Sequence, residues 1–215
     1  MNVESGKFIT FEGGEGAGKT TQAKRIVEAL ETVGKEVVIT REPGGTFGAE
    51  AIRELVISGA HERWSGMTEL LLVYAARLDH VEKLIKPALE RGAWVLCDRF
   101  NDSSMAYQGY ARGLGAKTVK TLNNIVLGDW SPDLTIVFDI DPILAQGRVK
   151  TRGESLNRFD TENLNFHKAI RAAFLEIAKQ DTDRVKVIDA ASPRDAITRQ
   201  IQHLMLQKFP DIGLD

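Results

Sequence analysis

A run of glycines followed by lysine and threonine near the amino terminus has the spacing of a phosphate-binding loop. Its residues are Gly13, Gly14, Glu15, Gly16, Ala17, Gly18, Lys19 and Thr20, which fit the pattern G-x-x-x-x-G-K-[ST]. The glycines let backbone N–H groups surround phosphates, Lys19 reaches the β and γ oxygens, and Thr20 can bind Mg²⁺. An apolar run precedes the pattern and a helical repeat follows it, which is the context of a P-loop. The motif predicts a site for a nucleoside triphosphate.

A P-loop leaves three classes of protein open. A GTPase switch needs the patterns N-K-x-D and D-x-x-G, and the sequence contains neither, so that class is nearly excluded. A mechanical or regulatory ATPase carries an acidic pair at the end of an apolar strand, for which Asp139 alone is weak support. A small kinase needs an acceptor site rich in cations, because the phosphates of donor and acceptor repel each other.

Arginines on other segments could supply these cations. Asp98 and Arg99 follow an apolar run, and a guanidinium is a planar fork that matches phosphate oxygens. The alternative for this pair is a surface salt bridge at a strand end. Three more arginines cluster where helical periodicity fails, namely Arg148, Arg152 and Arg158. They favour a mobile lid over residues 148–161 that closes on the phosphates, the alternative being a solvated charged face.

The secondary structure must bring these residues together. Short apolar runs rich in β-branched residues alternate with longer segments of helical period, which is typical of βαβ units and a parallel sheet. The expected strands are residues 8–11, 37–40, 94–97, 134–139 and 185–188. The expected helices are residues 19–33, 49–58, 67–91, 103–112, 117–127, 142–152, 162–180 and 193–209. We predict a three-layer α/β sandwich of the P-loop NTPase type, with a five-stranded parallel sheet, in one domain over residues 1–215.

Polar residues begin where each expected strand ends. They are Gly13, Arg41, Asp98, Asp139 and Asp189. In open α/β sheets, ligands bind in the crevice beyond the carboxyl ends of the strands. We therefore expect these residues to converge on one site.

Several longer motifs make the chain resemble the thymidylate kinase family. Residues 40–45 read T-R-E-P-G-G, and residues 98–109 fit D-R-[YFH]-x-x-S-x-x-A-Y-Q-G. Glu15 within the P-loop and the A-A-R segment that ends at Arg77 also match, so recognisable motifs extend from Gly13 to about Arg158. The resemblance implies transfer of a phosphoryl group from ATP to dTMP with Mg²⁺, and a homodimer formed through long helices such as residues 67–91. The alternatives are another nucleoside or nucleotide kinase, or a non-catalytic nucleotide-binding switch.

The resemblance also implies roles for single residues. Asp98 would lie near the metal with Thr20, and Arg99 would hold the acceptor phosphate. The other residues assigned to the acceptor are Glu15 and Tyr107 at the sugar, Arg53 at the phosphate, and Val73, Arg77, Ser104 and Gln108 at the base. Arg148 would bind ATP. Tyr107 packed against the sugar would favour deoxyribose, and its alternative is a half-buried helix residue.

Two of the base-site residues have their own alternatives. Arg77 lies on a largely apolar helix and needs a partner, which is the base in the family and otherwise Glu69 or another carboxylate. Val73 lies one turn earlier on the same face, where many relatives carry a phenylalanine that stacks on the base. The stacking contact is therefore expected to be weaker or to come from another residue.

The source of the cation for the transition state follows from position 16. Relatives with an arginine there supply it from the P-loop, whereas this chain has Gly16. The resemblance therefore assigns the role to the lid, through Arg152 and Arg158. Relatives commonly read D-R-[IFY]-E where residues 157–160 read N-R-F-D, so ion pairs of the lid should differ in detail.

Bulk composition sets limits on partners and compartment. The 28 basic and 30 acidic residues leave a formal charge of −2, so no global cationic field favours nucleic acid or a membrane surface. No apolar run is long enough to span a membrane. The single cysteine, Cys97, and a short polar amino terminus favour the cytoplasm. The His residues lack the spacing of a zinc site.

Overall fold

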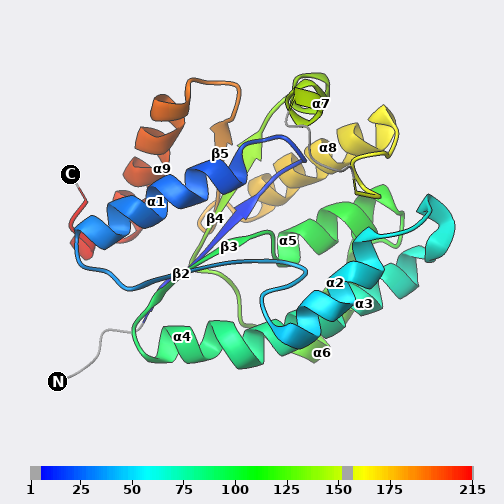
Figure 1. Ribbon diagram of the computed structural model, residues 1–215, viewed down its shortest axis with the longest axis horizontal. Helices are drawn as coiled ribbons and strands as arrows, with labels where there is room; N and C mark the ends of the chain where they lie inside the picture. Colours follow the sequence, from blue (N-terminus) through cyan, green and yellow to red (C-terminus); the bar gives the residue numbers. More distant parts are fainter. Residues whose placement is uncertain (1–5, 152–156, 215) are drawn as a thin grey trace.

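A five-stranded parallel sheet forms the centre of the computed structural model, which describes residues 6–151 and 157–214. The strands are β1 (Phe8–Glu12), β2 (Val37–Arg41), β3 (Trp94–Asp98), β4 (Leu134–Asp139) and β5 (Val185–Asp189). Their order in the sheet is β2-β3-β1-β4-β5, so β1 lies at the centre (Figure 1). The predicted parallel sheet is confirmed, and each strand begins where the apolar runs placed it.

Helices connect the strands and cover both faces of the sheet (Figure 1). The α-helices are α1 (Lys19–Thr32), α2 (Phe47–Ile57), α3 (Gly66–His80), α4 (Lys86–Glu90), α5 (Asn101–Ser104), α6 (Ala116–Leu127), α7 (Pro142–Thr151), α8 (Leu164–Gln180) and α9 (Arg194–Lys208). Two π-helical segments, η2 (Val81–Ile85) and η3 (Met105–Ala111), continue α3 into α4 and extend α5. Short 3₁₀ turns lie at His61–Arg63 and Pro210–Ile212. None of the helices in the described ranges has the length and apolar character needed to span a membrane.

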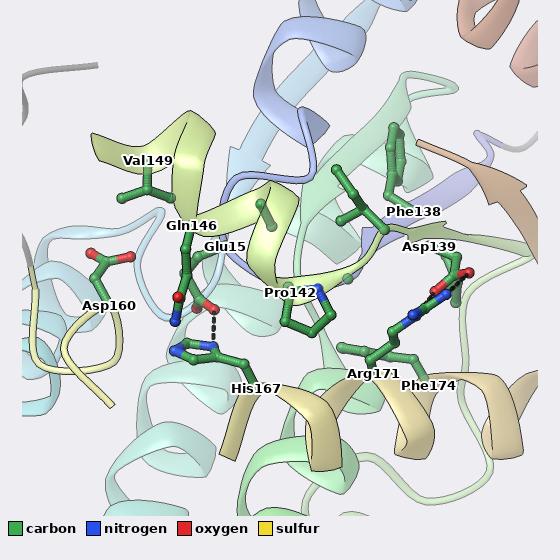
Figure 2. Close-up of a pocket in the computed structure, with 15 residues that line it drawn as sticks. Glu15, Phe138, Asp139, Pro142, Gln146, Val149, Asp160, His167, Arg171 and Phe174 are labelled. Atoms are coloured by element: carbon green, nitrogen blue, oxygen red, sulfur yellow. Dashed lines mark hydrogen bonds and ion pairs between the residues drawn. The ribbon is translucent and has the colours of Figure 1, made fainter. Parts of the chain in front are cut away.

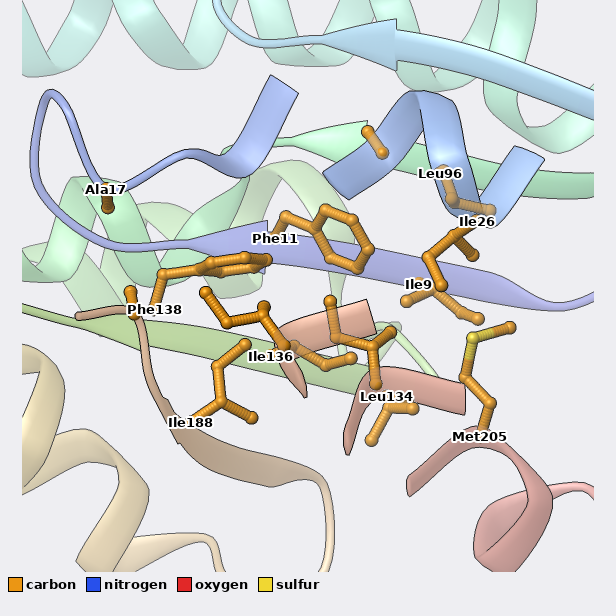
Figure 3. Close-up of a cluster of buried hydrophobic side chains, with 14 of the residues drawn as sticks. Ile9, Phe11, Ala17, Ile26, Leu96, Leu134, Ile136, Phe138, Ile188 and Met205 are labelled. Atoms are coloured by element: carbon orange, nitrogen blue, oxygen red, sulfur yellow. The ribbon is translucent and has the colours of Figure 1, made fainter. Parts of the chain in front are cut away.

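Alternate residues of the strands pack against different helices, which makes the two faces of the sheet apolar. Ile9 and Phe11 of β1 join residues of α1 and α9 in one cluster (Figure 3). Phe8 packs on the opposite face with η2 and α4, and Val137 of β4 packs there with α8. A fully buried side chain of this size stabilises the fold by about 1.5–3 kcal/mol.

The register of the sheet aligns the ends of the strands. Phe11 of β1 and Arg41 of β2 are both paired with Asp98 of β3, and Asp139 of β4 is paired with Asp189 of β5. The polar residues that follow the strands therefore share one edge of the sheet, as predicted. The P-loop, the segment after β3 and the amino-terminal part of α7 all lie at this edge.

Candidate active site

The P-loop curls around the side chain of its own lysine. Lys19 is buried, and its Nζ donates to the carbonyl oxygens of Gly13 at 3.2 Å and Gly14 at 3.0 Å. Burial, together with the charge of nearby Arg99, lowers the pKa of Lys19 to about 8. Its Nζ also lies 3.9 Å from Oδ1 of Asp98 on β3. The amine therefore lies at the loop with a carboxylate close by.

Thr20 and Asp98 offer two oxygen ligands of the kind that Mg²⁺ prefers. The hydroxyl of Thr20 donates to Oδ2 of Asp98 at 3.0 Å, which joins the start of α1 to the end of β3. The ion usually takes one or two protein oxygens and completes its shell with phosphate oxygens and water. This donor pair beside the P-loop fits a nucleotide-bound Mg²⁺.

Gly16 is required by the backbone of α7. Its φ is +74°, and a Cβ built there would lie 2.3 Å from the carbonyl oxygen of Ala145. Because that neighbour is backbone, it cannot rotate away as a flexible side chain would. The absence of a side chain at position 16 is therefore tied to the position of the helix that leads into the predicted lid.

Arg99 connects the P-loop to the segment after β3. Its guanidinium donates to the carbonyl of Gly13 at 2.9 Å and to Oε1 of Glu15 at 3.0 Å. Tyr107 donates to the same carboxylate oxygen at 2.7 Å, and the guanidinium lies over its ring, 5.1 Å from the centroid. Burial alone would raise the pKa of Glu15, but the charges of Arg99 and Lys19 hold it below its ordinary value.

A cavity of about 140 Å³ opens beside Arg99, and we call it the acceptor cavity after the residues that were predicted to bind the acceptor. All the residues that the sequence assigned to the acceptor line this cavity, namely Glu15, Arg53, Val73, Arg77, Arg99, Ser104, Tyr107 and Gln108. Arg53 donates to the carbonyl of Pro43 at 2.8 Å, and burial followed by the charge of Arg41 lowers its pKa. Phe100 and Phe159 line the cavity as well, so aromatic rings are present although position 73 is valine.

Arg77 forms an internal ion pair and still presents an unpaired donor. Its Nε donates to Glu42 at 2.7 Å, and its Nη2 donates to the carbonyl of Phe100 and to Ser104, both at 3.0 Å. Its Nη1 is buried without a hydrogen-bond partner among the described residues. The carboxylate expected from the sequence is therefore Glu42 rather than Glu69, and Nη1 remains available to a ligand in the cavity it lines.

Glu42 is itself held on a second side by histidine. Nδ1 of His80 lies 3.1 Å from Glu42, and Nε2 of His80 lies 2.7 Å from the hydroxyl of Thr40. Glu42 lies within the T-R-E-P-G-G motif, but the sequence assigned it no role. A carboxylate directly after an apolar strand was the available signal, because such a residue is buried near the sheet edge and needs cationic partners.

Arg158 occupies a different place from the one predicted. Its side chain is 1% exposed and donates to Glu69 of α3, while its Nε donates to the carbonyl of Val56 at 3.2 Å. It lines neither the acceptor cavity nor the space around the P-loop in this conformation. Glu69 is completely buried and accepts from Gln108 at 2.8 Å, so it requires a nearby cation. Arg158 thus ties the end of the predicted lid to α2 and α3.

The rest of the lid is only partly described. Arg152 lies outside the described residues. In the described part that begins at residue 157, the side chain of Asn157 accepts from the N–H of Phe159 at 2.8 Å, and Asp160 accepts from the N–H of Asn157 at 2.9 Å. Hydrogen bonds from backbone N–H groups to the side chains of Asn157 and Asp160 therefore close this turn.

Two further cavities border the P-loop. One, of about 310 Å³, lies between Gly16–Gly18, the segment after β5 and Arg148, whose Nη1 donates to the carbonyl of Ala190 at 2.9 Å. The other, of about 230 Å³, lies under α7 and is lined by Glu15, Asp160 and His167 (Figure 2). Nδ1 of His167 lies 3.7 Å from Oε2 of Glu15. Glu15 lines both this cavity and the acceptor cavity.

A P-loop beside a separate cavity that carries three arginines defines a nucleotide-dependent phosphotransferase of the P-loop class. A profile of the thymidylate kinase family matches residues 11–201. The chain belongs to the thymidylate kinase family.

Individual relatives agree over nearly the whole chain. The thymidylate kinase of Caulobacter vibrioides is 49% identical over 207 residues, which cover 96% of this chain and 99% of the relative. That of Magnetococcus marinus is 46% identical, covering 91% and 93% of the two chains. The crystal structure of thymidylate kinase from Ehrlichia chaffeensis superposes with a TM-score of 0.77 at 33% identity, covering 94% of this chain and all of the other.

Proposed function

We propose a division of roles among the residues of these cavities for the reaction that the family assigns to this chain, the phosphorylation of dTMP by ATP. The observation that carries the proposal is the position of Arg99. Its guanidinium donates to Gly13 and Glu15 of the P-loop, and Arg99 also lines the acceptor cavity. A group in this place can hold the acceptor phosphate beside the γ-phosphate of the donor, and positioning of this kind accounts for most of the catalysis of phosphoryl transfer.

The donor lies along the P-loop. Lys19 and the backbone N–H groups of the loop bind its phosphates, and Thr20 with Asp98 holds the Mg²⁺. The cavity between the P-loop and Arg148 takes the nucleoside part of ATP, because it continues from the phosphate-binding glycines. Bound Mg²⁺ supplies positive charge to the phosphate oxygens during in-line transfer.

The acceptor lies in the cavity lined by Arg77 and Arg99. The buried, unpaired Nη1 of Arg77 donates to an oxygen of the thymine base, and Ser104 and Gln108 border the same end. Phe100 and Phe159 provide the aromatic contact that Val73 does not. Glu15 accepts from the hydroxyl of the sugar, and Arg53 assists Arg99 at the phosphate.

The lid supplies the remaining cation. Because position 16 is glycine, the P-loop has no cation besides Lys19, and Arg152 is the arginine we assign to the transition state. Arg158, held by Glu69, acts in the described conformation as the anchor of the lid. We further infer a cytoplasmic homodimer that pairs through α3, because Met67, Leu71 and Leu78 expose apolar side chains on that helix.

The reaction is tested by release of ADP with dTMP, dUMP, dCMP, dAMP, dGMP and thymidine as acceptors. We expect dTMP to be the best acceptor, and Arg99→Ala to lose most activity while remaining folded. The control is Arg91→Ala, which removes an arginine paired with Glu36 on the surface. Preference for thymidine would indicate a nucleoside kinase, and the absence of turnover that depends on any of these acceptors would indicate a non-catalytic switch. Normal turnover of folded Arg99→Ala would refute its assignment.

A further inference from the structure

Arg99 has a backbone conformation that the surrounding structure must maintain. Its φ is +71°, and it is the one residue other than glycine with a positive φ in the described ranges. A left-handed conformation costs an ordinary residue roughly 1–2 kcal/mol. Its own N–H donates to the carbonyl of Phe11 at 2.9 Å. Further restraints must act on the residues that follow Arg99.

Glu12, the last residue of β1, supplies them from the neighbouring strand. It is fully buried, and its Oε1 accepts from the N–H of Phe100 at 2.8 Å and of Ser103 at 3.2 Å. These N–H groups belong to the first turn of α5, whose N-cap residue Phe100 provides no side-chain cap. A carboxylate in this place satisfies donors that otherwise lack partners at a helix start. Glu12 thereby fixes the turn directly after Arg99.

Ser103 extends the same contact to the guanidinium. Its hydroxyl donates to Oε2 of Glu12 at 2.5 Å and accepts from Nη1 of Arg99 at 3.3 Å. Because the hydroxyl proton is directed to Glu12, the oxygen is left to accept from Arg99. A continuous chain of hydrogen bonds thus runs from the end of β1 to the group assigned to the acceptor phosphate.

We propose that Glu12, acting through Ser103, is a positioning residue that holds Arg99 in the geometry that binds the acceptor phosphate. The inference rests on the proposed role of Arg99. Glu12 does not line the acceptor cavity or the cavities at the P-loop, so its effect on dTMP must pass through another residue. Asp102, one residue before Ser103, is a buried carboxylate that pairs with Arg184. After burial, its charge is what raises the pKa of Glu12 most, so Asp102→Asn removes a neighbouring carboxylate while favouring the ionised form of Glu12.

Substitutions separate the two parts of this chain. Glu12→Gln keeps an oxygen for the backbone donors but places an amide N–H against the hydroxyl oxygen of Ser103. That N–H then competes with Nη1 of Arg99 for the same oxygen, and the hydroxyl proton no longer has an acceptor at position 12. Ser103→Ala removes the link and leaves the contact of Glu12 with Phe100. Loss of a charge-assisted hydrogen bond corresponds to roughly tenfold or more in affinity. We expect each change to weaken dTMP binding by about tenfold and ADP binding by less than about twofold.

The experiment is a double-mutant cycle in which isothermal titration calorimetry measures the affinity of each variant for dTMP and for Mg²⁺-ADP. It uses the wild type, Glu12→Gln, Ser103→Ala, Arg99→Ala and the two double variants with Arg99→Ala, with Asp102→Asn as control and thermal unfolding of each. The expected result is that either change at Glu12 or Ser103 has less than about a twofold effect on dTMP binding once Arg99 is absent. If Glu12→Gln does not fold, the cycle with Ser103→Ala decides.

The outcomes distinguish the two proposals. Unchanged dTMP affinity in Arg99→Ala would overturn the role of Arg99 itself. A loss in Arg99→Ala with none in Glu12→Gln and Ser103→Ala would leave that role intact and overturn the inference. The same would follow from an equal loss in both backgrounds, from a parallel loss of ADP affinity, or from an equal loss in Asp102→Asn.

Discussion

The positive charges of Lys19 and Arg99 repel each other at the P-loop. Asp98 and Glu15 offset part of this repulsion, but burial and Arg99 still lower the pKa of Lys19. The lysine therefore changes charge within the range where the enzyme can be assayed. Phosphates of a bound nucleotide would restore the preference for the charged form, because they place negative charge beside it.

The pH dependence of ATP use should reveal this lysine. The pKa of Lys19 is about 8 in the unliganded protein, so the charged amine is lost as the pH rises above that value. We expect kcat/KM for ATP to fall by about tenfold per pH unit above pH 8, because kcat/KM reports the ionisation of the free enzyme. The measurement is a profile from pH 6.5 to 9.5 at a dTMP concentration well below its KM, so that the free enzyme is observed, and at constant free Mg²⁺. A profile that stays level beyond pH 9 would contradict the lowered pKa.

The residues that were predicted for the site from the sequence are those whose side-chain type and motif are typical of ligand binding. The P-loop and Arg99 are of this kind, and so are Tyr107 and Gln108 through the family motif. Glu12 and His80 were not among them, because their partners are distant in the sequence and come together only through the order of the strands. Glu12 contacts Ser103 across 91 positions. Such partners cannot be read from local spacing.

At the scale of elements, an ion pair between Glu69 of α3 and Arg158 fixes the carboxyl-terminal end of the predicted lid. The pair is buried on both sides, and Arg112 adds a second cation 3.6 Å from Glu69. A charge left alone in such a place is costly. The predicted lid therefore has one end joined to the helices beside the acceptor cavity, which is lined by Val56 and Ile57 of α2 among others.

Arg158→Ala should separate anchoring from catalysis. Removal of one member of a buried pair costs about 3–5 kcal/mol, and we expect a loss at the lower end because Arg112 remains beside Glu69. Urea denaturation measures this loss, with Arg91→Ala as the control for removal of an exposed arginine. A variant with the stability of the wild type and a kcat reduced by several powers of ten would instead support the catalytic role predicted from the sequence.

The boundaries of the helices were predicted better than their internal form. Residues 67–91 were expected as one helix, and the chain is helical there, but η2 inserts a π-helical segment between α3 and α4. A similar segment, η3, carries Tyr107 and Gln108. A π-turn shifts the faces of the helix after it, and a periodicity of 3.6 does not reveal that shift.

At the scale of the whole molecule, apolar side chains remain exposed on α3. Leu71 is 51% exposed and Met67 is 45% exposed, one helical turn apart. Residues at this spacing lie on the same face of a helix. This face is the reason we place the proposed dimer contact there.

Leu71→Asp should therefore shift the protein towards monomers. A charge in the centre of an apolar contact is desolvated without a partner, which we expect to raise the dissociation constant of the dimer by about a hundredfold or more. Sedimentation velocity over a range of protein concentrations measures the change. The matched control is Ile125→Asp, which alters another exposed apolar residue on α6. A wild type that sediments as a monomer throughout would exclude the proposed dimer.

The architecture was more predictable than the site, for a physical reason. Strands buried on both faces must be continuously apolar, so the runs around Ile9 and Ile136 announce a parallel sheet without knowledge of any partner. The rule that ligands bind beyond the strand ends then places the site. The position of Arg158 depended on the charge of Glu69 within α3, and nothing in the local sequence of either residue shows that they meet.

The close approach of Gly16 and Ala145 also constrains how such a chain can evolve. An arginine cannot be gained at position 16 by a single substitution, because the first carbon of its side chain would overlap the backbone of α7. The helix must move before position 16 of the P-loop can carry an arginine. Lineages with this arrangement are therefore expected to keep the arginines of the predicted lid under selection until that displacement has occurred. The displacement of α7 has to come first, and the gain of an arginine at position 16 second.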